Sequence, residues 1–169
     1  VWDAQTGESR AHLEARGLVG SAAFSPQGDA VASGLMLSKA IVWDLESGEI
    51  ESVFNPELNP LVANFDTSVA YSPDGGSVLT TWRGGVFIWD VKSSKKTRAF
   101  RTGGEEMTCM AFAPDGLSVA AGTRDHRVIV WDAETAEQRI VLEKQAGEVT
   151  SLAYSPNSQS IVTGSDDKL

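Results

Sequence analysis

The side chains that most often carry out chemistry are scarce in this sequence of 169 residues. The only histidines are His12 and His126, and the only cysteine is Cys109. These are too few for the common zinc sites, and one cysteine cannot form an internal disulfide. A Ser-His-Asp site needs a histidine positioned as a base in a cleft. The surrounding pattern instead predicts His12 on an outer polar strand and His126 in a turn, both solvated.

Motifs for nucleophiles and phosphates are missing as well. No GxGxxG or GxxxxGK segment occurs, and none of the 16 glycines belongs to a GxSxG nucleophile elbow. Cys109 lies in an apolar strand pattern over residues 107–112, which predicts a small buried side chain, whereas reactive thiols occupy exposed, electropositive places. The sequence therefore predicts a protein that is not an enzyme and needs no cofactor or metal.

The charge of the chain narrows the classes of partner. The sequence has 14 Lys and Arg against 23 Asp and Glu, so its formal net charge is −9. Nucleic acids and anionic membranes attract clustered basic residues, so neither is an expected partner. No apolar run approaches the ~20 residues that span a bilayer, and no signal-like segment opens the sequence. We expect a cytoplasmic protein whose partners are proteins or peptides.

The elements that must position any functional residue follow from a repeat. Trp-Asp pairs recur at intervals of 41, 46 and 42 residues, and an aromatic-Ser/Ala-Pro turn recurs at intervals of 47, 41 and 42 residues. The pairs are Trp2-Asp3, Trp43-Asp44, Trp89-Asp90 and Trp131-Asp132, and the turns end at Pro26, Pro73, Pro114 and Pro156. Two independent markers that keep one phase indicate structural repeats.

Each period contains short strand patterns and no segment of helical periodicity. The last repeat shows an alternating strand over residues 148–154, a turn at Pro156-Asn157-Ser158 and a second strand over residues 160–163. The third strand of a period is apolar on both faces, as at Val128-Ile129-Val130-Trp131, and a more polar fourth strand follows. Four short strands every ~42 residues are typical of one propeller blade, so the predicted fold class is an all-β propeller of four-stranded antiparallel blades.

The sequence resembles the WD-repeat (WD40) β-propeller family over almost its whole length. The best matching segments are residues 122–132 and 160–167. The resemblance implies structural roles for Trp2, Trp43, Trp89, Trp131, Asp125, Thr163 and Asp167. The family's Gly-His pair is absent from every repeat, its place in the last being near Lys144-Gln145, and Leu37 and Arg83 replace the turn aspartate in two repeats. The family's His-Ser/Thr-Trp network should thus be incomplete, with more reliance on apolar packing.

The phase of the repeats predicts how residues 1–169 are divided. Repeats end near Asp3, Asp44, Asp90 and Asp132, and the last is cut at Leu169. We expect three complete blades, half a blade before them and half a blade after them. Since the first residue is Val1 and both outer blades are incomplete, our hypothesis is a piece of a larger ring. The alternative is that the two half blades pair and close a four-bladed ring. Open end faces should bind the remaining propeller blades or self-associate.

Function in a repeat scaffold resides on loops, and the resemblance implies that one rim binds partners. The predicted rim residues are Met36, Trp82, Arg83, Arg124, Asp125, His126 and Asp166. Trp82 beside Arg83 has the composition of an interface hot spot, although it could equally fill a gap under its loop. The long loop over residues 55–64 is either a binding insertion or a tolerated one. We predict a non-catalytic scaffold; the alternative is a ligand-binding or enzymatic propeller of quinoprotein-like or lactonase-like type.

Overall fold

A computed structural model describes residues 1–35, 39–55, 67–82, 85–142 and 145–167 of the chain. These residues form strands and no helix. The strands are β1 (Val19–Phe24), β2 (Ala30–Leu35), β3 (Lys39–Asp44), β4 (Ile50–Phe54), β5 (Val69–Tyr71), β6 (Ser77–Trp82), β7 (Gly85–Asp90), β8 (Lys96–Arg101), β9 (Met107–Phe112), β10 (Ser118–Thr123), β11 (Val128–Asp132), β12 (Gln138–Leu142), β13 (Val149–Tyr154) and β14 (Ile161–Ser165).

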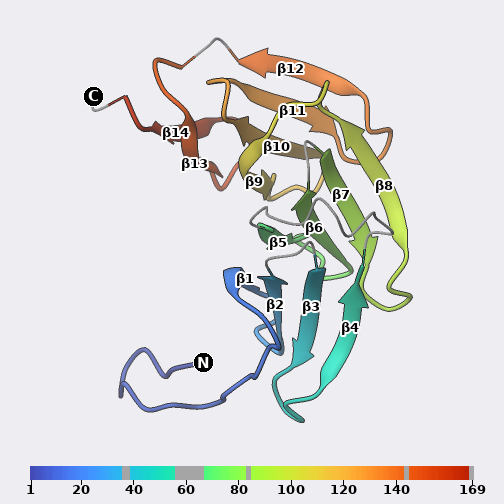
Figure 1. The fold of residues 1–169 in the computed structure, drawn as a ribbon, viewed down its shortest axis with the longest axis vertical. Helices are drawn as coiled ribbons and strands as arrows, with labels where there is room; N and C mark the ends of the chain where they lie inside the picture. Colours follow the sequence, from blue (N-terminus) through green and yellow to red (C-terminus); the bar gives the residue numbers. More distant parts are fainter. Residues whose placement is uncertain (36–38, 56–66, 83–84, 143–144, 168–169) are drawn as a thin grey trace.

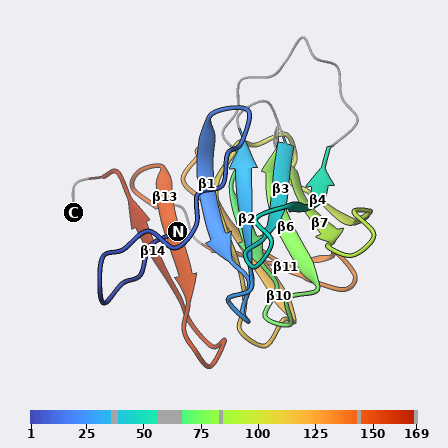
Figure 2. The ribbon, with the colours of Figure 1, turned by 90° about the horizontal axis from the view of Figure 1, so that it is seen from below.

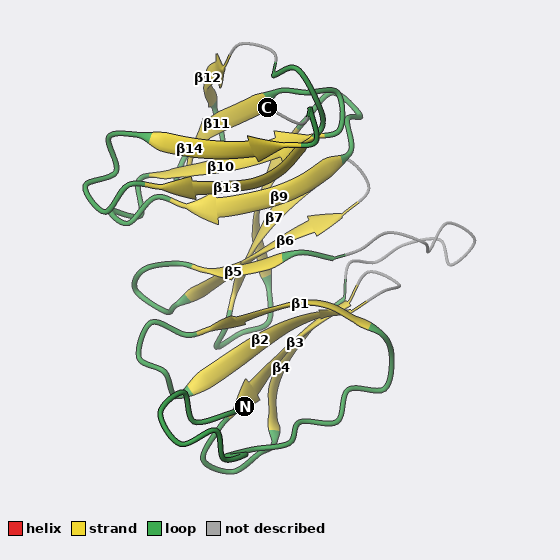
Figure 3. Cartoon of the chain, turned by 90° about the vertical axis from the view of Figure 1, so that its left-hand side faces the viewer, coloured by secondary structure: helices red, strands yellow, loops and turns green. Residues whose placement is uncertain are grey.

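The strands pair in chain order into antiparallel sheets. Strands β1–β4, β5–β8 and β9–β12 each form a four-stranded sheet, and β13–β14 form a two-stranded sheet. The sheets stand side by side in an open arc, with the first strand of each sheet on its inner side and the fourth on its outer side (Figure 1). Figure 3 shows the inner strands β1, β5, β9 and β13 in succession. The predicted fold class, an all-β arrangement of four-stranded antiparallel propeller blades, is confirmed.

An aspartate that follows each repeat tryptophan orders the turn between the third and fourth strands. The Asp44 carboxylate accepts a hydrogen bond from Ser47 N at 2.7 Å, and the Asp132 carboxylate accepts one from Thr135 N at 2.8 Å. The hydrogen bond from the backbone N–H of Thr135 is the largest influence on the pKa of Asp132, which is lowered to about 2, and Arg139 adds to this effect. The charged carboxylate thus fixes this turn, as short polar side chains often do.

Neighbouring sheets are held together by apolar residues. The tryptophan of one blade contacts an aromatic residue on the fourth strand of the preceding blade. The ring centroids of Trp89 and Phe54 lie 5.5 Å apart, and those of Trp131 and Phe100 lie 5.6 Å apart. All four side chains are buried. Stacked or tilted aromatic pairs add to the free energy gained by burying apolar area. The tryptophan therefore joins consecutive blades rather than strands of one blade.

The indole hydrogen bonds differ between blades. Trp43 Nε1 donates to Ser33 Oγ and Trp89 Nε1 donates to Thr80 Oγ1, both at 2.9 Å. In the third blade the equivalent residue is Ala121, seven residues after its turn proline, and it has no hydroxyl group. In the last repeat Thr163 takes this position, and its Oγ1 donates to Gln145 Oε1 at 3.4 Å. Gln145 thus stands where the family has histidine, and the network is incomplete.

The segment before β1 departs from the expected half blade. Within residues 1–18 the β-bridge between Trp2 and Ser9 is isolated, and the backbone N–H of Arg10 donates to Val1 O at 2.9 Å beside it; His12 lies outside any strand. Figures 1 and 2 show this segment as an extended trace outside the sheets. Trp2 is exposed, so the expectation that it lies in a blade core is wrong. The physical reason is that, among the described residues, no fourth strand of a preceding blade lies beside Trp2 to provide the contact that Phe54 gives to Trp89.

The half blades at the two ends do not pair with each other. In the described part of the chain, β14 pairs as a strand only with β13, and the β-bridge of Trp2 is with Ser9. The two segments lie at opposite ends of the arc (Figure 1). The structure therefore does not show the closed four-bladed ring that the sequence left open as an alternative.

Candidate functional site: a charged rim

One rim of the arc gathers loops from the third blade and the last repeat. The β8–β9 loop, the β10–β11 turn and the β12–β13 loop meet there, because antiparallel strands place alternate connections at the same end of a sheet. Backbone hydrogen bonds tie them together: Arg124 N donates to Glu106 O at 2.9 Å, and Gln145 N donates to His126 O at 2.6 Å. The turn that carries Arg124 is thus fixed to both neighbouring loops. We call this surface, formed by Glu105, Glu106, Arg124, Asp125, Arg127, Glu148 and Asp166, the charged rim.

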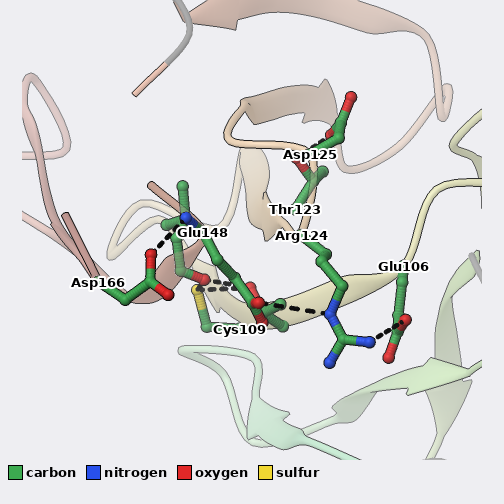
Figure 4. Close-up of polar contacts among 9 residues, drawn as sticks. Glu106, Cys109, Thr123, Arg124, Asp125, Glu148 and Asp166 are labelled. Atoms are coloured by element: carbon green, nitrogen blue, oxygen red, sulfur yellow. Dashed lines mark hydrogen bonds and ion pairs between the residues drawn. The ribbon is translucent and has the colours of Figure 1, made fainter. Parts of the chain in front are cut away.

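Arg124 bridges two blades (Figure 4). Its Nη1 lies 2.6 Å from Glu106 Oε2 in its own blade, and its Nε lies 3.4 Å from Glu148 Oε2 at the start of the next blade. The guanidinium is more than half exposed, and both carboxylates are about one third exposed. Ion pairs this exposed contribute little to stability, typically ~0–1 kcal/mol. Their main effect here is to hold two carboxylates of consecutive blades at a fixed separation on the surface.

The β10–β11 turn presents a second group of charges. Thr123 is fully buried, and its Oγ1 donates to Asp125 Oδ1 and accepts a hydrogen bond from Arg127 N at 2.9 Å. Arg127 also contacts Asp125 Oδ2 at 2.6 Å and forms an ion pair with Glu105. His126 takes a left-handed conformation with φ 75°, which closes the turn. The aspartate singled out from the sequence therefore organises this turn.

Asp166 belongs to the same rim. Its carboxylate accepts a hydrogen bond from Glu148 N at 2.8 Å, and its own N–H donates to Glu148 O at 3.1 Å. A Cβ atom on Gly147 would lie 2.3 Å from Asp166 Oδ1, so only glycine permits this approach. Asp166 thus positions Glu148, which in turn pairs with Arg124 (Figure 4).

The rim is electrostatically unbalanced. Five carboxylates and two guanidinium groups lie among its seven residues. Acidic groups in excess raise the local concentration of cationic ligands and speed their association. The chemistry that this surface can perform is therefore the recognition of basic groups. Among the described residues, no cluster of three His, Cys, Asp or Glu side chains has the arrangement of a metal site.

Trp82 lies apart from the charged rim. It ends β6, its ring centroid is 6.2 Å from that of Phe87, and it is half-buried. Its Nε1 is buried and has no hydrogen-bond acceptor among the described residues. The packing on Phe87 is that of a side chain that fills a gap, one of the two predicted roles of Trp82. The rest of the ring is exposed and accessible to a partner, as the other predicted role requires. Met36 and Arg83 lie outside the described residues.

Four of the residues predicted to bind a partner lie together in the structure. Arg124, Asp125, His126 and Asp166 lie on one rim, and Asp167 follows Asp166 beyond β14.

Cys109 is half-buried in β9, and burial raises the pKa of its thiol, so the thiol stays protonated at neutral pH. No helix within the described residues is long and apolar enough to cross a bilayer.

Four residues of the charged rim, Glu105, Glu106, Arg127 and Glu148, were not predicted from the sequence, although the repeat contains a signal for two of them. Glu106 and Glu148 each precede the proline of their repeat by eight residues. The repeat phase places both at the same point of consecutive blades, immediately before the first strand. The rim is thus formed by the loops before the first strands as well as by the predicted turns between second and third strands.

The stacked four-stranded antiparallel sheets, with inner first strands and outer fourth strands, define a segment of a β-propeller. The family model described as "WD domain, G-beta repeat" matches residues 95–132 and 137–169. These stretches contain β8–β11 and β12–β14, including the charged rim. The resemblance to the WD-repeat family is therefore confirmed at two positions of the chain, where the family model finds WD40 repeats.

Proteins similar to the chain include a plant protein and a designed protein. THO complex subunit 3 of Arabidopsis thaliana is 29% identical over 109 residues, which are 63% of this chain and 34% of that protein. The chain thus spans about a third of the length of that relative. The crystal structure of the computationally designed Ika4 protein superimposes with a TM-score of 0.79 at 21% identity, covering 96% of this chain and 94% of that chain. The second similarity concerns the fold alone.

Proposed function

We propose that the chain is a non-catalytic scaffold that binds a protein or peptide partner through the charged rim. The observation that carries this proposal is the bridge from Arg124 to Glu106 and Glu148, which fixes carboxylates of two blades at one surface. A partner segment with Lys or Arg at matching spacing would pair with these carboxylates. The relative named as a subunit of a complex supports a role in assembly.

We also propose Met36, Trp82 and Arg83 as contacts with a partner; Met36 and Arg83 lie outside the described residues. The end faces of the arc bind further propeller blades or self-associate.

Nucleic acid and membranes are not partners, consistent with the net charge of −9, and the location is cytoplasmic. A fluorescent fusion of the chain tests the location, and nuclear accumulation would contradict it.

The rim is tested with peptide arrays that vary only in charge. We expect Lys/Arg-rich peptides to bind the chain and acidic peptides of equal length not to bind. The double variant Glu106→Gln/Glu148→Gln should weaken binding about tenfold, and higher salt should weaken it for the wild type, because screening acts on exposed charges. The matched control Glu46→Gln/Glu49→Gln neutralises two exposed acids in the β3–β4 turn of the opposite rim. Equal affinity of both double variants would reject the charged rim as the binding surface.

A further inference from the structure

A pocket lies at the junction of the first and second blades, at the rim opposite the charged rim. It has a volume of about 330 Å³. Its walls are the β1–β2 turn, the β5–β6 turn, the start of the β3–β4 turn, strand β4 and Val91. Two hydrogen bonds across the junction hold these walls together: Gln27 Nε2 donates to Asp74 O at 3.4 Å, and Ser52 Oγ donates to Val91 O at 2.5 Å. We call this site the acidic pocket.

Four carboxylates line the acidic pocket, and its described lining contains no Lys, Arg or His side chain. The four residues are Asp29, Asp44, Glu51 and Asp74. Three of them are exposed, so the pocket opens to solvent. The hydroxyl groups of Ser25, Ser47 and Ser72 each donate to Oδ1 of one aspartate. Among the described residues nothing donates to Oδ2 of these aspartates, which therefore remains available to a ligand.

The acidic pocket lacks a cation that equivalent turns contain. Two other turns pair the aspartate of the Trp-Asp motif with an arginine seven residues later. These pairs are Asp3–Arg10 and Asp132–Arg139. Seven residues after Asp44 the chain has Glu51, which lies, like Arg139, at the register shift between the third and fourth strands. Two carboxylates repel each other, whereas a guanidinium is attracted to both, so this turn is left without the partner that the other two have.

The acidic pocket also contains a hydroxyl group without a partner. Tyr71 Oη is buried and has no hydrogen-bond partner among the described residues. At the equivalent place of the last repeat, Tyr154 Oη lies 3.0 Å from Ser118 Oγ of the third blade. In the first blade Ala30 takes the place of Ser118, four residues after the turn proline, and it has no hydroxyl group. A buried polar atom without a hydrogen bond is unfavourable, so a ligand that donates to Tyr71 Oη would remove this cost.

The chemical group that fits these partners is a guanidinium. Burial raises the pKa of the Tyr71 hydroxyl, and the carboxylates of Glu51 and Asp29 raise it further, so the hydroxyl stays protonated at neutral pH. Its oxygen can still accept a hydrogen bond from a ligand. A guanidinium has five N–H donors in one plane and no acceptor, which suits a pocket lined by acceptors on several sides. An ammonium is a point charge with three donors and cannot form the same paired contacts.

We propose that the acidic pocket binds the side chain of an arginine from a protein or peptide partner. The guanidinium pairs with Asp44 and Glu51, where two other turns have the chain's own arginine, and donates to the hydroxyl group of Tyr71. The acidic pocket is a second site, which goes beyond the proposed function of the charged rim and does not depend on it. All its walls belong to the first and second blades, so it is complete without any further blade.

The first test is an NMR titration of the chain with three capped tripeptides, Gly-Arg-Gly, Gly-Lys-Gly and Gly-citrulline-Gly. We expect Gly-Arg-Gly to shift the resonances of the residues that line the acidic pocket, with a saturable curve. Gly-Lys-Gly should bind at least about threefold more weakly, and the citrulline peptide, which has the shape without the charge, should not bind. Equal binding of either of these peptides, or no saturation by Gly-Arg-Gly at about 10 mM, would overturn the proposal. Tighter binding of free arginine would overturn a partner protein or peptide as its source.

The second test supplies the missing arginine from the chain itself. Glu51→Arg should pair with Asp44, occupy the acidic pocket and weaken the binding of Gly-Arg-Gly at least about tenfold. Glu49→Arg is the matched control, because it makes the same change of charge at an exposed position of the same hairpin that does not line the pocket. It should weaken binding less than about twofold, since exposed charges are screened. Equal losses in both variants would show that net charge, not the pocket, attracts the peptide.

The third test removes the hydroxyl group. Tyr71→Phe should weaken the binding of Gly-Arg-Gly about threefold without lowering the Tm, because the hydroxyl has no partner in the free chain. Tyr154→Phe is the control; it should lower the Tm, since it removes the contact with Ser118, and leave binding unchanged. A lower Tm with unchanged binding for Tyr71→Phe would contradict the proposed contact. Glu106→Gln/Glu148→Gln should leave the affinity of the acidic pocket unchanged, so a failure of the charged rim is distinguishable from a failure of the pocket.

Discussion

The blade junctions inside the arc and the faces at its ends have the same repeat sequence but different surroundings. Trp131 packs against Phe100 and is buried, whereas Trp2, in an equivalent Trp-Asp pair, is exposed. Both aspartates nevertheless form the same turn, with Asp3 accepting hydrogen bonds from Gln5 N and Thr6 N. The repeat sequence therefore specifies each hairpin locally, whereas the burial of its tryptophan depends on the neighbouring blade.

The largest difference in stability between a blade junction and an end of the arc is expected for substitutions of the tryptophans. Trp131→Ala should reduce the free energy of unfolding by about 3–5 kcal/mol, since it opens a cavity in a closed junction. Trp2→Ala should change it by less than about 0.5 kcal/mol in dilute protein, because the side chain is exposed. Urea unfolding followed by circular dichroism measures both. Equal losses would show that the segment around Trp2 is as tightly packed as the blades within the arc.

A second difference is expected for two equivalent glycines. A Cβ atom on Gly122 would lie 2.6 Å from Val149 Cγ1 of the next blade and 2.7 Å from Cys109 Sγ. On Gly164, a Cβ atom would meet Ser151 Oγ of its own sheet at 2.7 Å. Gly122→Ala should therefore cost about 1–3 kcal/mol through overpacking, and Gly164→Ala less, because a serine side chain can rotate away. If urea unfolding gave Gly164→Ala the larger loss, the blade junction would not be the constraint.

The hydroxyl groups that accept the indole N–H provide a finer comparison. Ser33→Ala leaves Trp43 Nε1 without its acceptor in a buried place, which should cost on the order of 1 kcal/mol. Thr163→Val in the last repeat removes a longer and partly exposed hydrogen bond to Gln145 and should cost less. Thermal unfolding of both variants at one pH measures the difference. The reverse order would mean that Gln145 takes over the family's histidine role more fully than its geometry indicates.

The smallest expected effect is the loss of stability at acidic pH. Backbone hydrogen bonds from Thr135 and contact with Arg139 lower the pKa of Asp132 from 3.8 to about 2. Because the folded pKa is depressed, the stability linked to this group is present above pH 3.8 and is lost as the pH falls towards 2. The Tm should thus drop over this interval, and Asp132→Asn should flatten the drop. Asp3→Asn, in the equivalent turn between Trp2 and Ser9, should leave the pH profile of global unfolding unchanged, because this turn lies outside the sheets.

Much of the fold could be predicted because the markers of the repeat are local. The Trp-Asp pairs and proline turns located the strands, and Ala121 explains why the indole network is incomplete. Trp2 could not be predicted, since its exposure depends on a neighbouring face that the local pattern does not describe. Of the charged rim, the sequence identified Arg124, Asp125 and Asp166 but not their partners. The partners of Arg124, Glu106 and Glu148, come from other loops that lie beside the β10–β11 turn only in the folded structure.

The register shifts on the outer strands have a consequence for how the molecule can grow. In each complete blade the pairing of the third and fourth strands slips by one residue beside the tryptophan, at Trp43, Trp89 and Trp131. Such bulges bend an edge and interrupt its row of free backbone groups, and exposed cations such as Lys96 on β8 add repulsion. The convex side of the arc is therefore closed to sheet extension, so that fibres through this edge are disfavoured.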